Sequence, residues 1–460
     1  MRLTVLMLII LAGLFLRVDQ AWQGAEENLP DSAAYERIAR GVSQQGEFEQ
    51  RGPGTPAYPQ PASNYSPGLP LLTAGIFELT GGDSARTARI LLALVATLAI
   101  PLSWRLACRL AGETAGLAAA AITAFYPTLI ADSGMLLTEP LAGTLLTAAL
   151  LAVLWARERT GPFRWILPGV LLGLTSLVRP EALLIAATLA VVLFVIDSRA
   201  GIRAALVPVA VMTAAAALVV SPLVARDLPQ TGRLVPISTG GGQTLFTGSY
   251  FASRGDPIDV MPRILRSNPS LNAKLNRQNR RSGEGPESVT PERVLTLLAA
   301  RRHPGVSTDA ALSRMGRDAY LAKLRSDPTG LAGYLTAKAG RIWWRGRWAL
   351  IGSPAGRILH RGVVFAFVVG LVTLAIRRRP EFWIVGAPVL SATVIGALLV
   401  ASPRRVLALW PLVGAVAGVG LSGLLQLASQ AGSNLPRRRS HSLTAPDARP
   451  PEPDPVPLRR

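Results

Sequence analysis

Four arginines lie at the ends of long apolar stretches of this 460-residue chain. Arg179 lies in LVRPEALL, Arg226 in SPLVARDLPQTGR, and Arg404 and Arg405 in ASPRRVLALWP. A guanidinium group at a membrane interface suits phosphate, because its planar fork donates two hydrogen bonds and stays charged when partly desolvated. Any one of these arginines could instead reach lipid headgroups without a catalytic role. The chemistry that the set predicts is the binding of a phosphate group.

Two acidic residues accompany these arginines. Glu139 lies one to two turns inside an apolar helix that opens with DSGMLLTEPLAGTLL, and Asp31 begins the stretch DSAAYERIARGV. An ionisable side chain inside an apolar span is costly to bury and is by default a functional candidate that faces a polar cavity. The alternatives are that Glu139 pairs with an arginine only for packing and that Asp31 is only a helix N-cap. Several arginines near one acid pair favour a functional site.

The elements that must position these residues are transmembrane helices. Hydrophobic residues make up 50% of the chain, charged residues 17%, and the mean hydropathy is +0.34, which indicates an integral membrane protein. The expected fold is an all-α polytopic membrane protein with about ten spans. The first apolar segment could be a secretory signal peptide, but no small-residue cleavage site follows it. The apolar stretches are residues 3–18, 86–107, 114–131, 134–155, 165–178, 180–196, 204–222, 358–376, 381–401 and 406–427.

Basic clusters between the spans indicate their orientation. RLACRLAGE, WARERTGPFRW and RRRP fall on the same side as the N-terminus, which the positive-inside rule makes cytoplasmic. The expected location is therefore the bacterial cytoplasmic membrane, with Asp31 on the outer face. The expected parts are an N-terminal membrane module with the candidate acids (1–222) that includes a first outer loop (19–85), an outer loop domain (223–357), C-terminal transmembrane helices (358–432) and a disordered cytoplasmic tail (433–460).

The loops carry local patterns of their own. In DSAAYERIARGV the apolar residues recur at helical spacing, which predicts an amphipathic helix in the interface. Residues 309–344 predict two outer helices that return the chain to the membrane, and 251–308 a partly ordered insertion. The glycine-rich stretch STGGGQTLFTGS (238–249) has no helix-forming context and predicts a turn. The short fifth and sixth apolar segments predict a tight hairpin around Arg179 and Pro180.

Five stretches, taken in order, resemble the GT-C-type membrane glycosyltransferases. PDSAAYERIAR resembles the first-loop D-E-x-x-Y-x-x-I-A signature of the group that holds the protein O-mannosyltransferases, the lipid A aminoarabinose transferases and the rhizobial lipopolysaccharide-core transferases. The others are YSPGLPLLTAGIFELT, YPTLIADSGMLLTEPL, LTSLVRPEALL and SPLVARDLPQTGRLVPISTGGGQTLFTGSY. The resemblance runs in order over roughly residues 1–250 and returns weakly at 310–345 and 402–412. It implies a GT-C-like fold with juxtamembrane helices in the first outer loop.

The resemblance also implies roles for single residues. Asp31 matches the family's first-loop catalytic acid, and Glu139 matches a second-loop acid that in relatives helps to organise the site or a metal. The sequence departs from the family pattern at Ser32, Ala34 and Ser66. The resemblance therefore specifies neither the use of a metal nor the identity of the sugar. The candidates for binding the donor phosphate are Arg179, Arg226, Arg404 and Arg405, and those for binding substrate are Tyr35 and Tyr65.

The reaction implied by the resemblance is sugar transfer from a polyprenyl-phosphate-linked donor to an envelope glycan, lipid or protein. Asp31 would take the proton of the acceptor hydroxyl as it attacks the anomeric carbon, and the arginines would stabilise charge on the departing phosphate. This predicts inversion by a single displacement. No cofactor is certain. The family leaves a divalent metal open, while the three scattered histidines show no ligand spacing.

Two other classes of protein stay open. A lipid or sugar transporter or flippase would also have many spans and interfacial arginines, but it should carry charges near the bilayer midplane and often shows internal repeats. A scaffold of an envelope assembly would need no acid in a cavity. The expected partners are the lipid-linked donor, the acceptor and membrane lipid. The net charge of +20 suits anionic lipid and does not imply nucleic acid.

Overall fold

The computed structural model describes residues 2–25, 29–48, 65–231, 237–253, 259–282, 291–346 and 353–433. Every regular element in these ranges is helical, which confirms the all-α fold class. Within these described ranges, eight helices are long and apolar enough to cross a membrane, or nine if the bent pair α6 and α7 forms one span. The apolar helices that form the candidate spans, together with the shorter apolar helix α9, are α1 (Arg2–Gln23), α4 (Ala85–Thr97), α5 (Ala99–Ala111), α6 (Glu113–Phe125), α7 (Pro127–Ala131), α8 (Thr138–Arg157), α9 (Ile166–Val178), α10 (Ala182–Asp197), α11 (Ile202–Thr231), α19 (Pro354–Ile376), α20 (Pro380–Leu398) and α22 (Trp410–Ser433).

The number of spans is slightly below the ten expected, and two boundaries move. Helices α4 and α5 together form one candidate span, and the segment expected at 165–178 forms α9, an apolar helix too short to count as a span. Helix α11 continues past residue 222 to Thr231, so Arg226 lies within it. The chain divides into two units, Met1–Gly423 and Leu424–Arg460, and the features described below belong to the first. The expected tail lies outside the described residues beyond Ser433.

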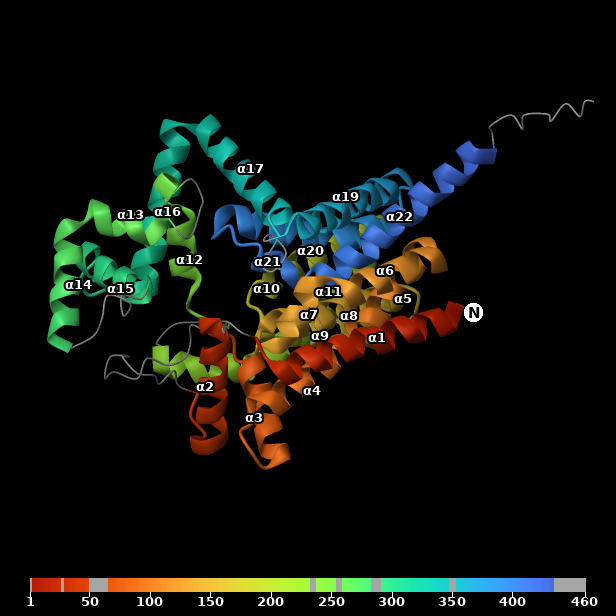
Figure 1. Ribbon diagram of the computed structural model, residues 1–460. Coiled ribbons are helices and arrows are strands. Elements are labelled where there is room, and N and C mark those ends of the chain that lie inside the picture. Colours follow the sequence, from red (N-terminus) through yellow and green to blue (C-terminus); the bar gives the residue numbers. More distant parts are fainter. Residues whose placement is uncertain are drawn as a thin grey trace, which may run out of the picture. The chain divides into compact units, whose positions relative to one another are not determined.

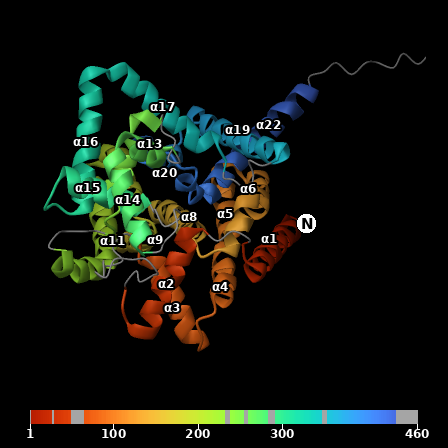
Figure 2. The same cartoon turned by 60° about the vertical axis from the view of Figure 1, so that its left-hand side comes forward.

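Two helices of the first loop lie side by side, α2 (Pro30–Gln45) and α3 (Gly68–Thr80) (Figures 1 and 2). Pro30 occupies the first turn of α2, where a backbone N–H would have no acceptor within the helix. The positive end of the helix dipole stabilises the negative charge of the adjacent Asp31. The apolar positions, which include Ile38 and Ala39, are buried. Gly46 ends the helix in the left-handed conformation with φ 68°. The predicted amphipathic helix is confirmed, and Asp31 makes no side-chain cap.

A second group of helices packs on its own apolar core, and we call it the loop module. Figure 1 shows α13 to α16 gathered together. Their buried side chains, which include Leu275, Leu295 and Leu312, form this core. The insertion expected to be partly ordered therefore holds three packed helices in its described part. The module consists of the helices that form this core, α12 (Gly241–Gly248), α13 (Val260–Ser267), α14 (Pro269–Ser282), α15 (Pro291–Arg302) and α16 (Thr308–Ser326), and of α17 (Pro328–Trp344), which follows α16 and packs on α20.

The prediction of a turn at 238–249 is wrong, because residues 241–248 form helix α12. Tertiary contacts outweigh the low helix propensity of glycine here. The backbone N–H of Gly242 donates to the Asp309 carboxylate of α16 at 2.7 Å. A Cβ atom on Gly242 would lie 2.0 Å from the Asp309 carbonyl oxygen, so only glycine allows the two helices to approach this closely.

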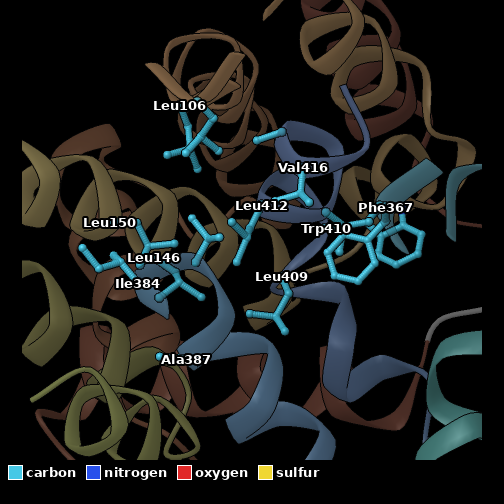
Figure 3. Packing of buried hydrophobic residues seen from close by; sticks show 14 of the residues in the cluster. Leu106, Leu146, Leu150, Phe367, Ile384, Ala387, Leu409, Trp410, Leu412 and Val416 are labelled. Atoms are coloured by element: carbon cyan, nitrogen blue, oxygen red, sulfur yellow. The ribbon is translucent and has the colours of Figure 1, made fainter. Parts of the chain in front are cut away.

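The largest apolar core joins helices from both ends of the chain. Leu146 and Leu150 of α8 lie in one buried cluster with Ile384 of α20 and with Leu409 and Leu412 next to and within α22 (Figure 3). Burial of such side chains contributes about 1.5–3 kcal/mol each in water, and inside a membrane the same contacts act mainly through close packing. This core fixes the N-terminal end of α8 relative to the segment before α22.

A buried arginine stabilises the break between α6 and α7. Pro127 has no N–H, so the carbonyl of Thr123 cannot receive its usual helical hydrogen bond. Arg17 of α1, which is 2% exposed, donates to this carbonyl at 2.6 Å and to that of Ala124 at 3.1 Å. Backbone groups inside a membrane need such partners, because no water replaces them. Arg17 therefore holds the bent span in place.

Candidate functional site

Charged side chains from four distant segments meet at the helix ends, and we call them the ion-pair cluster. Helix α8 begins at Thr138, so Glu139 lies in its first turn and not one to two turns inside, because Pro140 fits a helix only at its start. The cluster consists of Asp31 in α2, Glu139 in α8, Arg179 and Glu181 in the link between α9 and α10, and Arg404 and Arg405 in the short helix α21 (Arg404–Leu407).

Arg404 joins the two acids that the sequence marks. Its Nη1 donates to Asp31 Oδ2 at 2.6 Å, and its Nε donates to Glu139 Oε1 at 2.9 Å. Arg179 reaches the same Glu139 oxygen from the other side, with Nη1 at 3.3 Å. Asp31 and Glu139, which are far apart in the sequence, therefore contact one guanidinium group.

The cluster continues through Glu181. Its Oε1 lies 3.4 Å from Arg179 Nη2 and 2.8 Å from Arg405 Nη1. Arg405 also donates from Nε to the carbonyl of Val400 at 2.8 Å, which ties the guanidinium to the backbone before α21. The link itself is the predicted hairpin: α9 ends at Val178 and α10 starts at Ala182.

Three carboxylates and three guanidinium groups leave the cluster with no formal net charge. The Glu139 side chain is 0% exposed, and a buried carboxylate is stable only with charged or hydrogen-bonded partners, which Arg179 and Arg404 provide. Asp31 is the most accessible member, with 43% of its side chain exposed. A molecule that enters the cluster from solvent therefore meets Asp31 first.

Nearby charges keep Glu181 ionised. Burial raises its pKa, but the guanidinium groups of Arg179 and Arg405 outweigh burial and lower the pKa to about 2. Burial, and then the Glu139 carboxylate, raise the pKa of the Tyr35 hydroxyl, which therefore stays protonated and can donate. The site thus holds fixed negative and positive charges and a neutral hydroxyl at neutral pH.

An apolar pocket adjoins the cluster. Arg179, Glu181 and Arg405 are its charged lining residues. Its other walls come from α8, α9, α10, α20 and the segment of α21, and are mostly apolar. An apolar cavity lined at one place by guanidinium groups suits an amphiphile with an anionic headgroup. The apolar lining includes Ala142, Leu146, Ile185, Ala392, Ile395 and Leu409.

Comparison with known proteins decides the fold. Residues 62–225, which hold Glu139, Arg179 and Glu181, match the family model described as dolichyl-phosphate-mannose-protein mannosyltransferase. The archaeal oligosaccharyltransferase AglB from Archaeoglobus fulgidus, in complex with an inhibitory peptide and a dolichol-phosphate, gives a TM-score of 0.57 at 18% identity over 94% of this chain and 51% of that one. The chain has a GT-C-type membrane glycosyltransferase fold.

Other solved structures resemble this GT-C chain as well. The A. fulgidus oligosaccharyltransferase in complex with Zn and sulfate gives a TM-score of 0.56 at 16% identity, over 93% of this chain and 50% of that one. ArnT from Cupriavidus metallidurans bound to undecaprenyl phosphate gives a TM-score of 0.42 at 15% identity, over 93% and 79%. The GT-C chain spans about half the length of the oligosaccharyltransferases that it matches. No curated protein sequence matches it.

The two tyrosines expected to bind substrate pack next to the cluster in the GT-C chain. Tyr35 and Tyr65 meet edge to face, with ring centroids 5.4 Å apart. Tyr35 is buried in an apolar group with Val178, which directly precedes Arg179, and Ala408, which follows helix α21. The structure thus places both tyrosines near the charged residues, and their role in substrate binding stays a prediction.

Arg226 is paired outside the ion-pair cluster in the described structure. Its guanidinium group pairs with the adjacent Asp227 at 2.6 Å and lies 4.8 Å from the centre of the Phe48 ring. Among the described residues, no ion pair joins Arg226 to a member of the cluster. Its assignment to the donor phosphate stays a prediction.

The sequence pattern missed Glu181 as a member of the site. An acid directly after Arg179-Pro180, at the tip of a hairpin between two apolar segments, was the available signal, because such a group needs a charged partner there. Its second partner, Arg405, is more than two hundred positions away in the sequence, and only the fold brings them together.

A divalent metal does not fit the ion-pair cluster of this GT-C chain. The guanidinium group of Arg404 already lies between Asp31 and Glu139 and donates to both carboxylates. In the described ranges, no group of three or more His, Cys, Asp or Glu side chains is arranged to hold a metal ion. The side chains of the cluster are therefore suited to binding an anion through arginines.

Proposed function

We propose that this chain is a membrane glycosyltransferase that moves a sugar from a polyprenyl-phosphate-linked donor to an envelope glycan, lipid or protein. The observation that carries the proposal is the contact of Arg404 with both Asp31 and Glu139, beside an apolar pocket lined by Arg179 and Arg405. A lipid-linked donor needs these features together, namely an apolar surface for its chain, cations for its phosphate and a carboxylate for the acceptor.

The donor would lie with its first isoprene units in the pocket and its phosphate at Arg404 and Arg405. Phosphate oxygens accept charge-assisted hydrogen bonds from guanidinium groups, and the low dielectric of a buried site strengthens them. As the bond between the anomeric carbon and the phosphate oxygen breaks, negative charge grows on that oxygen. Arginines already fixed by Glu139 and Glu181 stabilise this charge without reorganising.

Asp31 would act as the general base. Its carboxylate is the most accessible in the cluster, so an acceptor hydroxyl can approach it. The hydroxyl oxygen forms a bond with the anomeric carbon, its proton passes to Asp31, and the polyprenyl phosphate leaves with the electron pair of the broken bond. A single displacement of this kind inverts the configuration of the anomeric carbon. Glu139 is too deeply buried for this role and orients Arg404.

Donor binding would also release Asp31. In the structure, Asp31 accepts a hydrogen bond from Arg404 Nη1, the donor that we assign to the phosphate. A phosphate that takes over this hydrogen bond leaves the Asp31 carboxylate free to accept a proton. The order of events is then donor first and acceptor second, because the base is available only after the donor is bound.

The proposed setting is the outer face of a bacterial cytoplasmic membrane. Its support is the excess of basic residues in the loops on the side of the N-terminus, which places α2 and the start of α8 on the opposite side. A donor whose lipid stays in the bilayer presents its phosphate at this edge, where the helices that carry the cluster end.

One assay tests the proposal. Purified protein in detergent is mixed with a polyprenyl-phosphate sugar and an envelope extract, and the release of polyprenyl phosphate is followed. We expect release by the wild type and by Asp83→Asn, and a loss with Asp31→Asn. Asp83 is a matched control because its side chain is 44% exposed and pairs with Arg40. A donor that stays intact with the wild type would instead favour a transporter, a flippase or a scaffold.

A further inference from the structure

A buried lysine of the loop module lies outside the ion-pair cluster and close to it. Lys338 of α17 is 1% exposed, and its Nζ donates to the carbonyl of Gly248 at 2.8 Å. Within the described ranges no carboxylate forms an ion pair with this ammonium group. Burying an amine that has only a backbone carbonyl and a hydroxyl as partners costs free energy, which points to a role beyond packing.

Three side chains converge on the same carbonyl at the end of α12. Besides Lys338, the hydroxyl groups of Tyr320 and Tyr334 lie 2.9 and 2.8 Å from the Gly248 oxygen. The Tyr320 hydroxyl is also 2.6 Å from the carbonyl oxygen of Leu398 and accepts from Lys338 Nζ at 3.3 Å. A tyrosine has only one proton to donate, and of the two carbonyls that of Leu398 is the nearer acceptor for the Tyr320 hydroxyl.

Gly248 itself packs directly on the chain that follows. A Cβ atom at this position would lie 2.5 Å from the carbonyl carbon and oxygen of Leu399. No side chain fits in that space, so the end of α12 rests on the backbone of residues 398 and 399. The contact is between the loop module and the C-terminal end of α20.

This backbone leads straight into the donor arginines. Helix α20 ends at Leu398, Arg405 donates to the carbonyl of Val400 at 2.8 Å, and Arg404 follows in the first turn of α21. We call residues 398–405 the arginine segment. Burial, and then the charges of Arg405 and Arg341, lower the pKa of Lys338 to about 7, which agrees with its closeness to this segment.

We propose that Lys338, acting through Gly248 and Tyr320, is a positioning residue that holds the arginine segment so that Arg404 and Arg405 face the donor phosphate. The proposal rests on the proposed function, because it assigns the phosphate to these two arginines. It gives the loop module a part in the reaction, since the module carries all three residues of the link.

The first test compares Lys338→Met with Lys323→Met in the full-length protein in detergent. Both changes remove one lysine amine from the loop module, but Lys323 pairs with Asp327 on its surface. Amide hydrogen exchange of residues 398–405 is expected to accelerate about tenfold or more in Lys338→Met and to stay unchanged in Lys323→Met. Equal exchange in the two variants would overturn the link between Lys338 and the segment.

The second test separates positioning from general stability. In Lys338→Met the donor KM should rise about tenfold with a smaller change in kcat, because the arginines are displaced while Asp31 is untouched. Faster exchange of the segment with an unchanged donor KM would overturn the positioning role. Hydrogen exchange does not depend on turnover, so a wild type that leaves the donor intact refutes the proposed function and not the link.

A conservative pair covers the case in which Lys338→Met does not fold. Tyr320→Phe and Tyr334→Phe each remove one hydroxyl near the Gly248 carbonyl, but only Tyr320 also contacts Leu398. We expect faster exchange of residues 398–405 and a higher donor KM in Tyr320→Phe, with little change in Tyr334→Phe. The reverse order would overturn the path from Lys338 through Tyr320 to Leu398.

Discussion

Replacing Asp31 with asparagine separates catalysis from donor binding. The change keeps the size of the side chain and one acceptor oxygen, and removes its negative charge and its ability to accept a proton. We expect the transfer rate to fall roughly 100- to 10,000-fold, the usual contribution of a general base. In activation free energy this is about 2.7–5.5 kcal/mol.

Binding of polyprenyl phosphate should change in the opposite direction. In the wild type, Asp31 competes with the phosphate for Arg404, to which it is bound at 2.6 Å. An ion pair with this much exposure contributes about 0.2–1 kcal/mol. Its removal should therefore tighten binding of polyprenyl phosphate by about 1.4- to 5-fold.

The assay is paired, with turnover and polyprenyl phosphate affinity measured on the same protein preparation. Asp83→Asn is the control, because it removes an equally exposed acid of another arginine pair. A double change tests the partner: Asp31→Asn should give no gain in affinity in the background of Arg404→Gln, which removes the cation. Near-normal turnover of Asp31→Asn would refute the base assignment, and equal gains with and without Arg404→Gln would refute the competition for Arg404.

Four other positions give further predictions. Arg405→Ala should raise the donor KM about 10- to 100-fold through a lost charge-assisted hydrogen bond, and Arg226→Ala should raise it less, because Arg226 pairs with Asp227 away from the cluster. Equal effects would place Arg226 at the phosphate. Because the pKa of Glu181 is lowered to about 2, its ion pairs should stabilise the protein fully above about pH 4.5 and lose that effect as the pH falls toward 2. The melting temperatures of wild type and Glu181→Gln in detergent should therefore converge over this range, and a constant difference would contradict the assignment. Arg17→Met should cost about 1–3 kcal/mol for each carbonyl left unpaired, measured by denaturation in detergent, and an unchanged stability would contradict its role at the bent span.

The sequence predicts the helices well, because each depends on a local pattern. Long apolar stretches give α1, α8 and α19, proline positions give the hairpin at residues 179–181, and apolar spacing gives α2. The helix at 241–248 could not be predicted in this way, since it depends on a close approach to Asp309 that only the tertiary fold provides.

For the candidate site too, the sequence predicts the local features and not the contacts that depend on the tertiary fold. Asp31, Glu139 and the arginines stand out as charged groups beside apolar segments, which is a local property. Their mutual contacts, such as Arg404 with both acids, depend on how α2, α8 and α21 pack and have no signature in the sequence. Arg17 escaped notice because its partners are backbone carbonyls and not acids.

The most direct measurement is a cryo-EM structure of the wild type with polyprenyl phosphate bound. We expect phosphate oxygens within hydrogen-bonding distance of Arg404 and Arg405 and the first isoprene units in the adjacent apolar pocket. We also expect Asp31 to be released from Arg404. A phosphate bound elsewhere, with the contacts among Asp31, Arg404 and Glu139 unchanged, would contradict these expectations.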